Sequence, residues 1–194
     1  MTNHAKSREG TASLLTHDRQ GHGAACESSK KPGAIELIAE SVSKSFPARG
    51  RDLTILREVS MRMSGGESAA ILGPSGSGKS TLLNILGTLE SPTSGTVTLN
   101  GLNPFQMGER ELARFRNQNT GFIFQEHHLL PQCTVLENVL LPSLASRETA
   151  GRLARAQELI ASVGLADRLD HRPGDLSGGE RLRVAIARAL INDP

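Results

Sequence analysis

The sequence is poor in aromatic residues and in cysteine. Its 194 residues include five phenylalanines but no tryptophan and no tyrosine, so recognition of single-stranded nucleic acid by base stacking is poorly supported. The two cysteines, Cys26 and Cys133, form no CxxC pair, which favours a reducing compartment over a disulfide scaffold. No stretch approaches the roughly 20 consecutive apolar residues of a transmembrane helix. The chain is therefore not expected to span a membrane by itself.

A strong excess of one charge is also absent. Lysine and arginine number 22 against 20 acidic residues, which gives a formal net charge of +2. That value is too small to argue for a nucleic-acid partner or an anionic membrane surface. The remaining composition, 37% hydrophobic and 22% charged, is typical of one globular domain with an appendage.

Residues 1–33 differ from the rest of the chain. They are polar and rich in glycine and serine, and Leu14 and Leu15 form their only apolar cluster. Because that cluster is too short for the core of a signal peptide, we interpret this segment as a disordered N-terminal tail. The scattered His4, His17 and His22 are interpreted as solvated side chains and not as a metal site.

The pattern from residue 34 onward predicts an α/β domain over residues 34–194. Two strands are expected on either side of a loop at Pro47–Asp52, and an Asn-Gly hairpin is expected after the alternating run TVTL. Short apolar runs predict buried strands at Ser68–Leu72 and Gly121–Gln125. Helical spacing predicts four helices, at about residues 80–87, 135–141, 148–163 and 178–190. The inward face predicted for the last helix consists of Leu182, Ala185, Ile186, Ala189 and Leu190.

The stretch GPSGSGKST, Gly73–Thr81, fits the phosphate-binding pattern G-x-x-x-x-G-K-[ST] and lies between a predicted strand and a predicted helix. Glycine lets the backbone curl so that successive N–H groups point at one anion, and the helix that follows adds its positive dipole end. Lys79 is expected to contact the β- and γ-phosphates, and the Ser80 hydroxyl to bind Mg²⁺. A dinucleotide GxGxxG motif is disfavoured because the glycine spacing differs.

A second glycine pair occurs in LSGGE, Leu176–Glu180, at the start of the last predicted helix. Two interpretations are open for it. Ser177 is either an ordinary helix N-cap or part of a second anion site, built from a hydroxyl, free N–H groups and a helix N-terminus. In the second case, this loop closes the other side of a triphosphate, most simply one bound by another copy of the chain.

Together, GPSGSGKSTLLNILGTLESPTSGTVTLNG, GFIFQEHHLLPQCTVLENVLLP and LSGGERLRVAIARALINDP resemble the nucleotide-binding domains of ABC transporters. The resemblance runs from about Ile35 to Pro194, and it is greatest with the ATPases of lipoprotein-releasing and macrolide-export systems, the LolD and MacB type. It implies a P-loop NTPase fold of the ABC type, with an antiparallel β subdomain and a helical subdomain at about residues 126–176.

The resemblance also implies roles for particular residues. Gln125 would contact Mg²⁺ or the attacking water, and Phe46 would stack on adenine, although a strand-end core phenylalanine is the alternative. The family often has Gln where Glu180 stands, and Gln-rich sequence where Arg181–Arg183 stand. The residues implied to bind ATP are Phe46, Gly73, Pro74, Ser75, Gly76, Ser77, Gly78, Lys79, Ser80, Thr81, Ser177, Gly178, Gly179 and Glu180; those implied to act in catalysis are Lys79 and Gln125, and those implied to hold the metal are Ser80 and Gln125.

A function follows from the same resemblance. ATP binding and hydrolysis in a head-to-tail homodimer would drive transmembrane permease subunits to export or release a lipoprotein, lipid or hydrophobic compound. The chain would be peripheral at the cytoplasmic face of the membrane, with EHHLLPQCTVLENV toward the permease and His127 and His128 at the surface. The alternative is a regulatory ATP-binding module, coupled to a membrane protein that transports nothing. A DNA-repair or chromosome ATPase is disfavoured, because the interval from Gln125 to Leu176 is too short for a long coiled coil.

The resemblance predicts one further feature. In the family, a Walker B strand with an Asp and a catalytic Glu follows a proline such as Pro194, so the C-terminal part of the fold is expected to be missing from these 194 residues. Hydrolysis needs a firmly held metal and a polarised water. We therefore expect the chain as given to be weakly stable, to bind ATP and to hydrolyse it poorly or not at all.

Overall fold

The computed structural model describes residues 13–17, 35–48, 51–145 and 151–194. The chain divides into two compact units, residues 1–107 and 108–194, each with its own hydrophobic core. None of the helices in the described ranges has the length and apolar character needed to cross a membrane.

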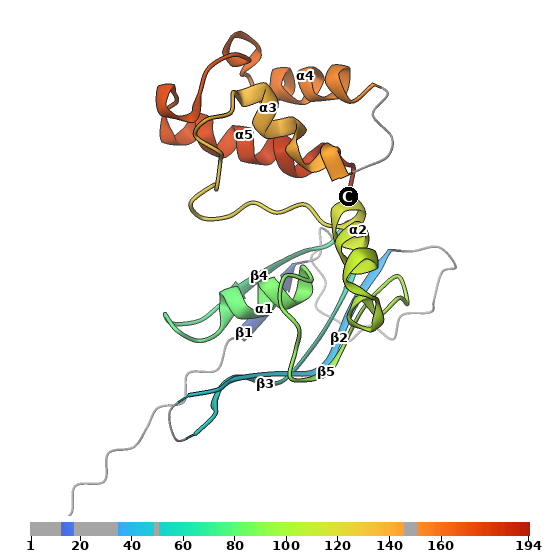
Figure 1. Cartoon of the computed structure of the whole chain (residues 1–194). Helices are drawn as coiled ribbons and strands as arrows, with labels where there is room; N and C mark the ends of the chain where they lie inside the picture. Colours follow the sequence, from blue (N-terminus) through green and yellow to red (C-terminus); the bar gives the residue numbers. More distant parts are fainter. Residues whose placement is uncertain (1–12, 18–34, 49–50, 146–150) are drawn as a thin grey trace, which may run out of the picture. The chain divides into compact units, whose positions relative to one another are not determined.

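The first unit contains a three-stranded antiparallel sheet in the order β3–β2–β5 (Figure 1). Its strands are β2 (Glu36–Phe46), β3 (Leu53–Ser64) and β5 (Ser94–Leu99), so the predicted strand pair around Pro47–Asp52 is confirmed. Burying one apolar face of this sheet against helix α1 (Lys79–Leu86) forms the core of the unit. The buried core residues are Ala39, Val42, Leu56, Met61, Leu82, Ile85 and Val97.

The predicted Asn-Gly turn is confirmed at the end of β5. Asn100 and Gly101 both have left-handed backbone angles, φ 54° and 78°, as a two-residue hairpin turn requires. The Leu99 N–H donates to the Leu102 carbonyl at 2.9 Å, and the Leu102 N–H donates back at 3.0 Å. The returning strand consists of this single bridge, because a short 3₁₀ helix, η1 (Pro104–Gln106), follows at once.

Strand β4 (Ser68–Leu72) leads into the glycine-rich loop and then α1, as predicted, but the prediction that it is buried is wrong. Leu72 is 50% exposed, because β4 pairs with one neighbour in the described part of the chain instead of lying inside a sheet covered on both faces. That neighbour is β1 (Ser13–His17), which pairs with β4 in antiparallel register. Part of the segment predicted to be disordered is therefore a strand; the rest of residues 1–33 lies outside the described residues.

The second unit is helical. It contains α2 (Glu109–Asn119), α3 (Val135–Leu140), α4 (Arg152–Ser162) and α5 (Gly178–Leu190), with short 3₁₀ helices at η2 (Leu141–Ala145), η3 (Ala166–Arg168) and η4 (Pro173–Asp175). Helices α3, α4 and α5 pack against one another (Figure 1). Three of the four helices correspond to predicted ones, and α2 was not predicted. The start of the helix expected from residue 148 lies outside the described residues, which resume at Gly151.

The predicted inward face of α5 is confirmed only in part. Ala185 is fully buried, and Ile186 and Ala189 are half-buried, but Leu182 and Leu190 are 40% and 45% exposed. Val184, Ala187 and, just beyond the helix, Ile191 are fully buried although they were not predicted to face inward. Apolar residues occur on two sides of this helix, and periodicity alone does not tell which side meets a neighbour. The side that carries Val184 and Ala187 packs into the core shared with α3 and α4.

The predicted strand at Gly121–Gln125 is also wrong. The segment has no regular secondary structure up to Phe124, it pairs with no strand in the described part of the chain, and Ile123 is 52% exposed. An apolar run becomes a strand only where a neighbouring strand satisfies its N–H and C=O groups. This segment instead lies beside α5, since a Cβ atom added to Gly121 would be 3.2 Å from the carbonyl carbon of Ala189.

A buried amide organises the loop before α3. Asn138 is fully buried, and its Oδ1 accepts a hydrogen bond from the Leu130 N–H at 2.8 Å. Its Nδ2 group donates to the carbonyls of Leu130, Cys133 and Thr134 at 2.9–3.1 Å. The burial of this polar side chain is thus compensated by hydrogen bonds to the loop backbone.

The contact between β2 and β5 gives a first prediction. Gly95 has φ 87°, and a Cβ atom there would be 2.6 Å from the Glu40 carbonyl oxygen; Gly101 has φ 78° with nothing within 4 Å. Gly101→Ala should therefore cost only the left-handed backbone penalty, about 1–2 kcal/mol of unfolding free energy. Gly95→Ala should cost about 3 kcal/mol or more. Urea unfolding of both variants measures the difference, and equal losses would contradict the close approach.

Candidate functional site

The loop between β4 and α1 adopts the curled backbone that its glycines predict. Gly76 and Gly78 have φ values of 79° and 90°, in the left-handed region that glycine adopts without penalty. Gly78 is also the N-cap of α1 and makes no side-chain capping bond. The two left-handed residues bend the chain through the loop and direct it into the helix at Lys79.

The ammonium group of Lys79 holds this loop closed. It donates to the carbonyl oxygens of Gly73 and Pro74 at 3.0 and 2.7 Å. The side chain therefore folds back onto the beginning of the loop and does not extend into solvent. Its positive charge lies at the loop, where an anion bound by the backbone would meet it.

The loop presents a set of free hydrogen-bond donors. The Ser77 N–H is bonded to the Pro74 carbonyl at 3.3 Å, but the N–H groups of Gly76, Gly78, Lys79 and Ser80 have no partner among the described residues. Several of them belong to the first turn of α1, where helical N–H groups remain unpaired and the helix dipole is positive. These donors, the lysine charge and the exposed backbone at Gly76 fit a phosphate group.

Four hydroxyl groups lie in the same loop, those of Ser75, Ser77, Ser80 and Thr81. The Ser77 Oγ atom is buried and has no hydrogen-bond partner in the part of the chain that the structure describes. Ser80 is exposed, and its hydroxyl makes no hydrogen bond to a described residue. Mg²⁺ takes oxygen ligands and usually keeps several waters and phosphate oxygens around it, so a single free hydroxyl is a suitable protein ligand. The chemistry of the loop thus fits a metal-bound phosphate.

The loop is packed against β3, and β3 also pairs with the strand that carries Phe46. A Cβ atom on Gly78 would lie 2.8 Å from Leu56 Cδ2 and 2.9 Å from Ile55 Cγ2, so glycine is required there by space as well as by φ. Phe46 of β2 is paired with Leu53 of β3. Leu53 precedes Ile55 and Leu56 by two and three residues, a distance of roughly 7–10 Å along the strand. Phe46 therefore lies near the loop within the first unit.

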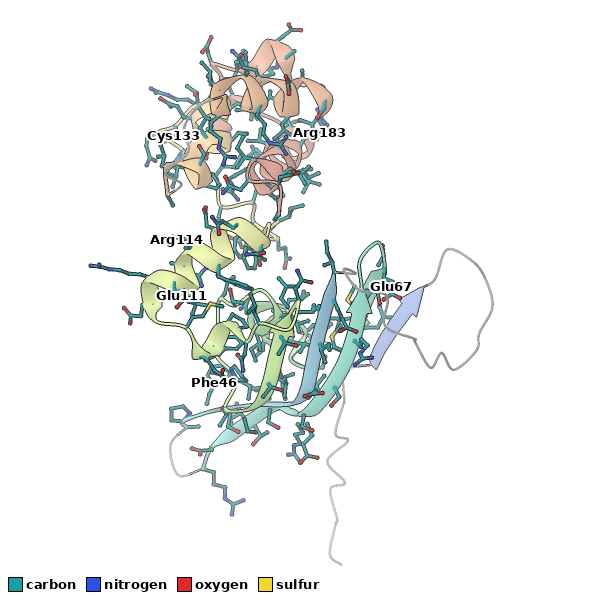
Figure 2. All side chains as sticks on the ribbon, turned by 90° about the vertical axis from the view of Figure 1, so that its right-hand side faces the viewer. Phe46, Glu67, Glu111, Arg114, Cys133 and Arg183 are labelled. Carbon is teal, nitrogen blue, oxygen red and sulfur yellow. The ribbon has the colours of Figure 1, made fainter. Side chains whose placement is uncertain are left out.

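Phe46 lies at the end of β2 and is half-buried (Figure 2). It is not part of the buried core of the unit. The Lys44 ammonium lies 5.0 Å from the ring centroid, a cation–π distance. Glu90 Oε1 at 3.0 Å and the Ser91 carbonyl at 2.7 Å hold this ammonium group. Sequence reasoning missed the contact between Lys44 and Phe46, although residues two apart on one strand share a face.

The second glycine loop forms the start of α5 in the other unit. Ser177 is the N-cap: its Oγ atom accepts from the Glu180 N–H at 3.3 Å, and Glu180 Oε2 accepts from the Ser177 N–H at 2.8 Å. The Ser177 hydroxyl also donates to Glu180 Oε2 at 2.7 Å. The N-cap interpretation is confirmed, and anion binding by Gly178 and Gly179 stays a prediction.

The Glu180 carboxylate is held in its ionised form. Hydrogen bonds from the Ser177 side chain and backbone lower its pKa, and the Arg168 guanidinium, 3.5 Å away, lowers it further. Glu180 thus completes a capping box. Sequence reasoning missed Arg168 as its partner, because the two residues belong to different elements, η3 and α5.

Gln125 lies in a tight turn of the second unit, closed by a hydrogen bond from the His127 N–H to the Phe124 carbonyl at 3.0 Å. Its side chain is exposed. After it, Arg188 of α5 donates to the carbonyls of His127 and His128 at 2.6 and 2.7 Å, a contact that sequence reasoning also missed. Within the described ranges, no three His, Cys, Asp or Glu side chains form a metal-binding group.

Comparison with known proteins agrees with this geometry. The profile of the ABC transporter family matches residues 56–194. The chain is 57% identical over 159 residues to the lipoprotein-releasing system ATP-binding protein LolD 1 of Rhodopirellula baltica, covering 81% of this chain and 69% of that protein. It is 53% identical over 166 residues to LolD of Shewanella denitrificans, covering 84% and 71%. It is 48% identical over 157 residues to the macrolide export ATP-binding/permease protein MacB of Burkholderia cenocepacia, covering 80% and 23%.

Solved structures give the same result. The ATP-binding cassette MJ0796, in a dimeric post-hydrolysis state bound to ADP and Pi, superposes with a TM-score of 0.73 at 36% identity, over 81% of this chain and 70% of that one. Another dimeric structure of MJ0796, a bacterial ABC transporter cassette, gives 0.70 at 35% identity, over the same shares of the two chains. The predicted fold class, an ABC-type P-loop NTPase with an antiparallel β subdomain, is confirmed.

The two left-handed glycines of the loop give a second prediction. Gly76→Ala should weaken Mg²⁺–ATP binding roughly tenfold, because only the backbone conformation is penalised. Gly78→Ala should weaken it roughly a hundredfold or more, because the new methyl group also displaces the loop from Ile55 and Leu56. Isothermal titration of both variants measures the ratio, and equal affinities would contradict the packing of Gly78 against β3.

Glu180 gives a third prediction, which concerns pH. Its lowered pKa means that it stabilises the folded state above its ordinary pKa of 4.5, and that this contribution is lost as the pH falls through the folded value. Glu180→Gln should therefore be less stable than the wild type near neutral pH, and the difference should disappear in acid. Urea unfolding of both proteins from neutral to acid pH tests this prediction, with Glu158→Gln on the exposed face of α4 as the control. A difference independent of pH would contradict the assignment.

Proposed function

The chain belongs to the ABC transporter family of ATP-binding proteins, and from this we propose that it is the energy-coupling subunit of a transporter that releases lipoproteins from a membrane. The observation that carries the proposal is the loop Gly73–Thr81, with its unpaired N–H groups and the ammonium group that closes it. Identities of 53–57% to LolD proteins support lipoprotein release as the process. Lipids and hydrophobic compounds are the other candidate substrates.

Five residues of the loop have a proposed task. The N–H groups around Gly76 and Gly78 bind the β-phosphate, and Lys79 exchanges one or both of its carbonyl partners for β- and γ-phosphate oxygens. Thr81 reaches the α-phosphate. Ser80 and Gln125 are the proposed protein ligands of Mg²⁺, which supplies charge neutralisation on the phosphates when bound.

Adenine recognition is proposed for Phe46. Its ring is half-buried and outside the core, and it lies on the strand next to β3, which contacts Gly78. An exposed ring face can stack on a purine. The cation–π contact with the Lys44 ammonium is proposed to hold the Phe46 ring in one orientation before adenine binds.

Hydrolysis is proposed to need two copies of the chain, arranged head to tail. Ser177, Gly178, Gly179 and Glu180 of one copy then cap the γ-phosphate bound by the loop of the other. The dimeric state of the MJ0796 structures supports the involvement of two copies. Gln125 orients the attacking water, and the segment after it, Glu126–Thr134, is the proposed contact with transmembrane permease subunits at the cytoplasmic face of the membrane.

Removing the loop ammonium tests the proposal. Lys79→Ala should weaken Mg²⁺–ATP binding by roughly ten- to a hundredfold, because charge-assisted hydrogen bonds to the phosphates are lost. Arg114→Ala is the matched control, since it removes the same charge from the exposed face of α2 (Figure 2). Titration calorimetry measures both. An unchanged affinity of Lys79→Ala, or a lack of nucleotide binding by the wild type, would overturn the proposed function.

A further inference from the structure

Both ends of the segment Gly121–His128 contact the C-terminal turn of α5. We propose that Arg188 is a positioning residue that ties the turn carrying Gln125 to α5, so that this turn and the LSGGE helix move as one body. The functional meaning of this link rests on the proposed function, because Gln125 matters for hydrolysis only if ATP is bound. The physical link itself can be tested without nucleotide.

The first observation is the geometry of Arg188. Its Nη2 and Nη1 atoms donate to the carbonyl oxygens of two successive residues, His127 and His128, at 2.6 and 2.7 Å. A planar guanidinium group can hold two acceptors in a fixed orientation, which a lysine ammonium cannot do in the same way. Partial burial lowers the pKa of the Arg188 guanidinium from its usual value, but the group remains charged, so both hydrogen bonds are charge-assisted.

The second observation is the conformation of the residues that Arg188 holds. His127 and His128 have φ values of 61° and 45°, and two successive left-handed residues other than glycine are unfavourable unless their surroundings fix them. The His127 N–H closes the turn onto Phe124 at 3.0 Å. The His128 ring packs edge-on against the Phe124 ring at 4.9 Å. Gln125 lies between these fixed points, so holding His127 and His128 also positions Gln125.

The third observation is the close approach at Gly121. A Cβ atom there would lie 3.2 Å from the Ala189 carbonyl carbon and would overlap its oxygen. Glycine is thus needed for the segment to lie directly on the last turn of α5, one residue beyond Arg188. This turn is itself restrained, since Arg155 of α4 donates to the Ile191 and Leu190 carbonyls at 3.1 and 3.2 Å.

The fourth observation is the length of α5. Arg188 follows the N-cap Ser177 by three helical turns, a rise of roughly 16 Å along a single helix. A continuous helix with a buried face transmits displacement along its axis without a flexible joint. A shift of the LSGGE loop is therefore expected to carry the Gln125 turn with it, and contact at Glu126–Thr134 is expected to move LSGGE in return.

Fluorine NMR tests the link directly on the 194-residue chain. Incorporated fluorophenylalanine reports from five positions. Phe122 and Phe124, whose rings stack at 5.6 Å, lie between the contact at Gly121 and the contact at His127 and His128. In Arg188→Lys the Phe124 resonance should shift or broaden, while those of Phe46 and Phe105 in the first unit stay in place. Arg183→Lys is the control, as the same change on the same helix (Figure 2).

Hydrogen exchange separates positioning from simple helix stability. In the wild type, the His127 and His128 amides should exchange at rates close to those of the last turn of α5. In Arg188→Lys they should exchange roughly ten- to a hundredfold faster, while the amides of α5 and the melting temperature change little. A uniform loss of protection over α5, or no change at His127 and His128, would overturn the proposal. If Arg188→Lys does not fold, the exchange rates of the wild type alone test the proposal. Exchange of the His127 and His128 amides far faster than that of the α5 amides would show that the turn and the helix do not move as one body.

The same samples keep the two proposals apart. Titration with Mg²⁺–ATP measures nucleotide binding in the wild type and in Arg188→Lys. Absence of binding by the wild type would remove the proposed function and leave the exchange result intact. Normal binding together with unchanged Phe124 and amide signals in Arg188→Lys would remove the link between Arg188 and the Gln125 turn and leave the proposed function standing.

Discussion

Closure of the loop Gly73–Thr81 onto its own backbone is the constraint on which the candidate site depends. The N–H groups of consecutive residues can converge on one anion only if Gly76 and Gly78 remain left-handed and the beginning of the loop stays near the start of α1. Lys79 supplies that closure through the carbonyls of Gly73 and Pro74. The same ammonium group is therefore positioned for an anion before one binds, which reduces the reorganisation that binding requires.

Much of the candidate site could be predicted because it is encoded in short stretches of backbone chemistry. Positive φ values at Gly76, Gly78, Asn100 and Gly101, and the capping pair Ser177 and Glu180, each depend on residues within four positions of one another. Local rules describe such features well. The antiparallel strands β2 and β3 could also be predicted, because a single short loop joins them.

The remaining features depend on partners distant in the sequence. The apolar residues of Ser68–Leu72 and Gly121–Gln125 fit buried strands, but among the described residues neither segment lies between two other strands, so both keep exposed side chains. Helix α2 escaped prediction because it is polar almost all round and buries only Phe115. Arg168 and Arg188 act on groups in other elements, one on the Glu180 carboxylate and one on backbone carbonyls, and such contacts leave no periodic signal in the sequence.

The buried side chain of Asn138 has a consequence for how the helical unit selects its structure. An apolar residue of similar size would let the loop before α3 take several paths over the helix, since burial is not directional. The amide does not, because another path would leave its hydrogen bonds to the backbone of Leu130, Cys133 and Thr134 unmade in a dry interior. It penalises other conformations of this loop more than it strengthens the native one, and so fixes how the chain enters α3.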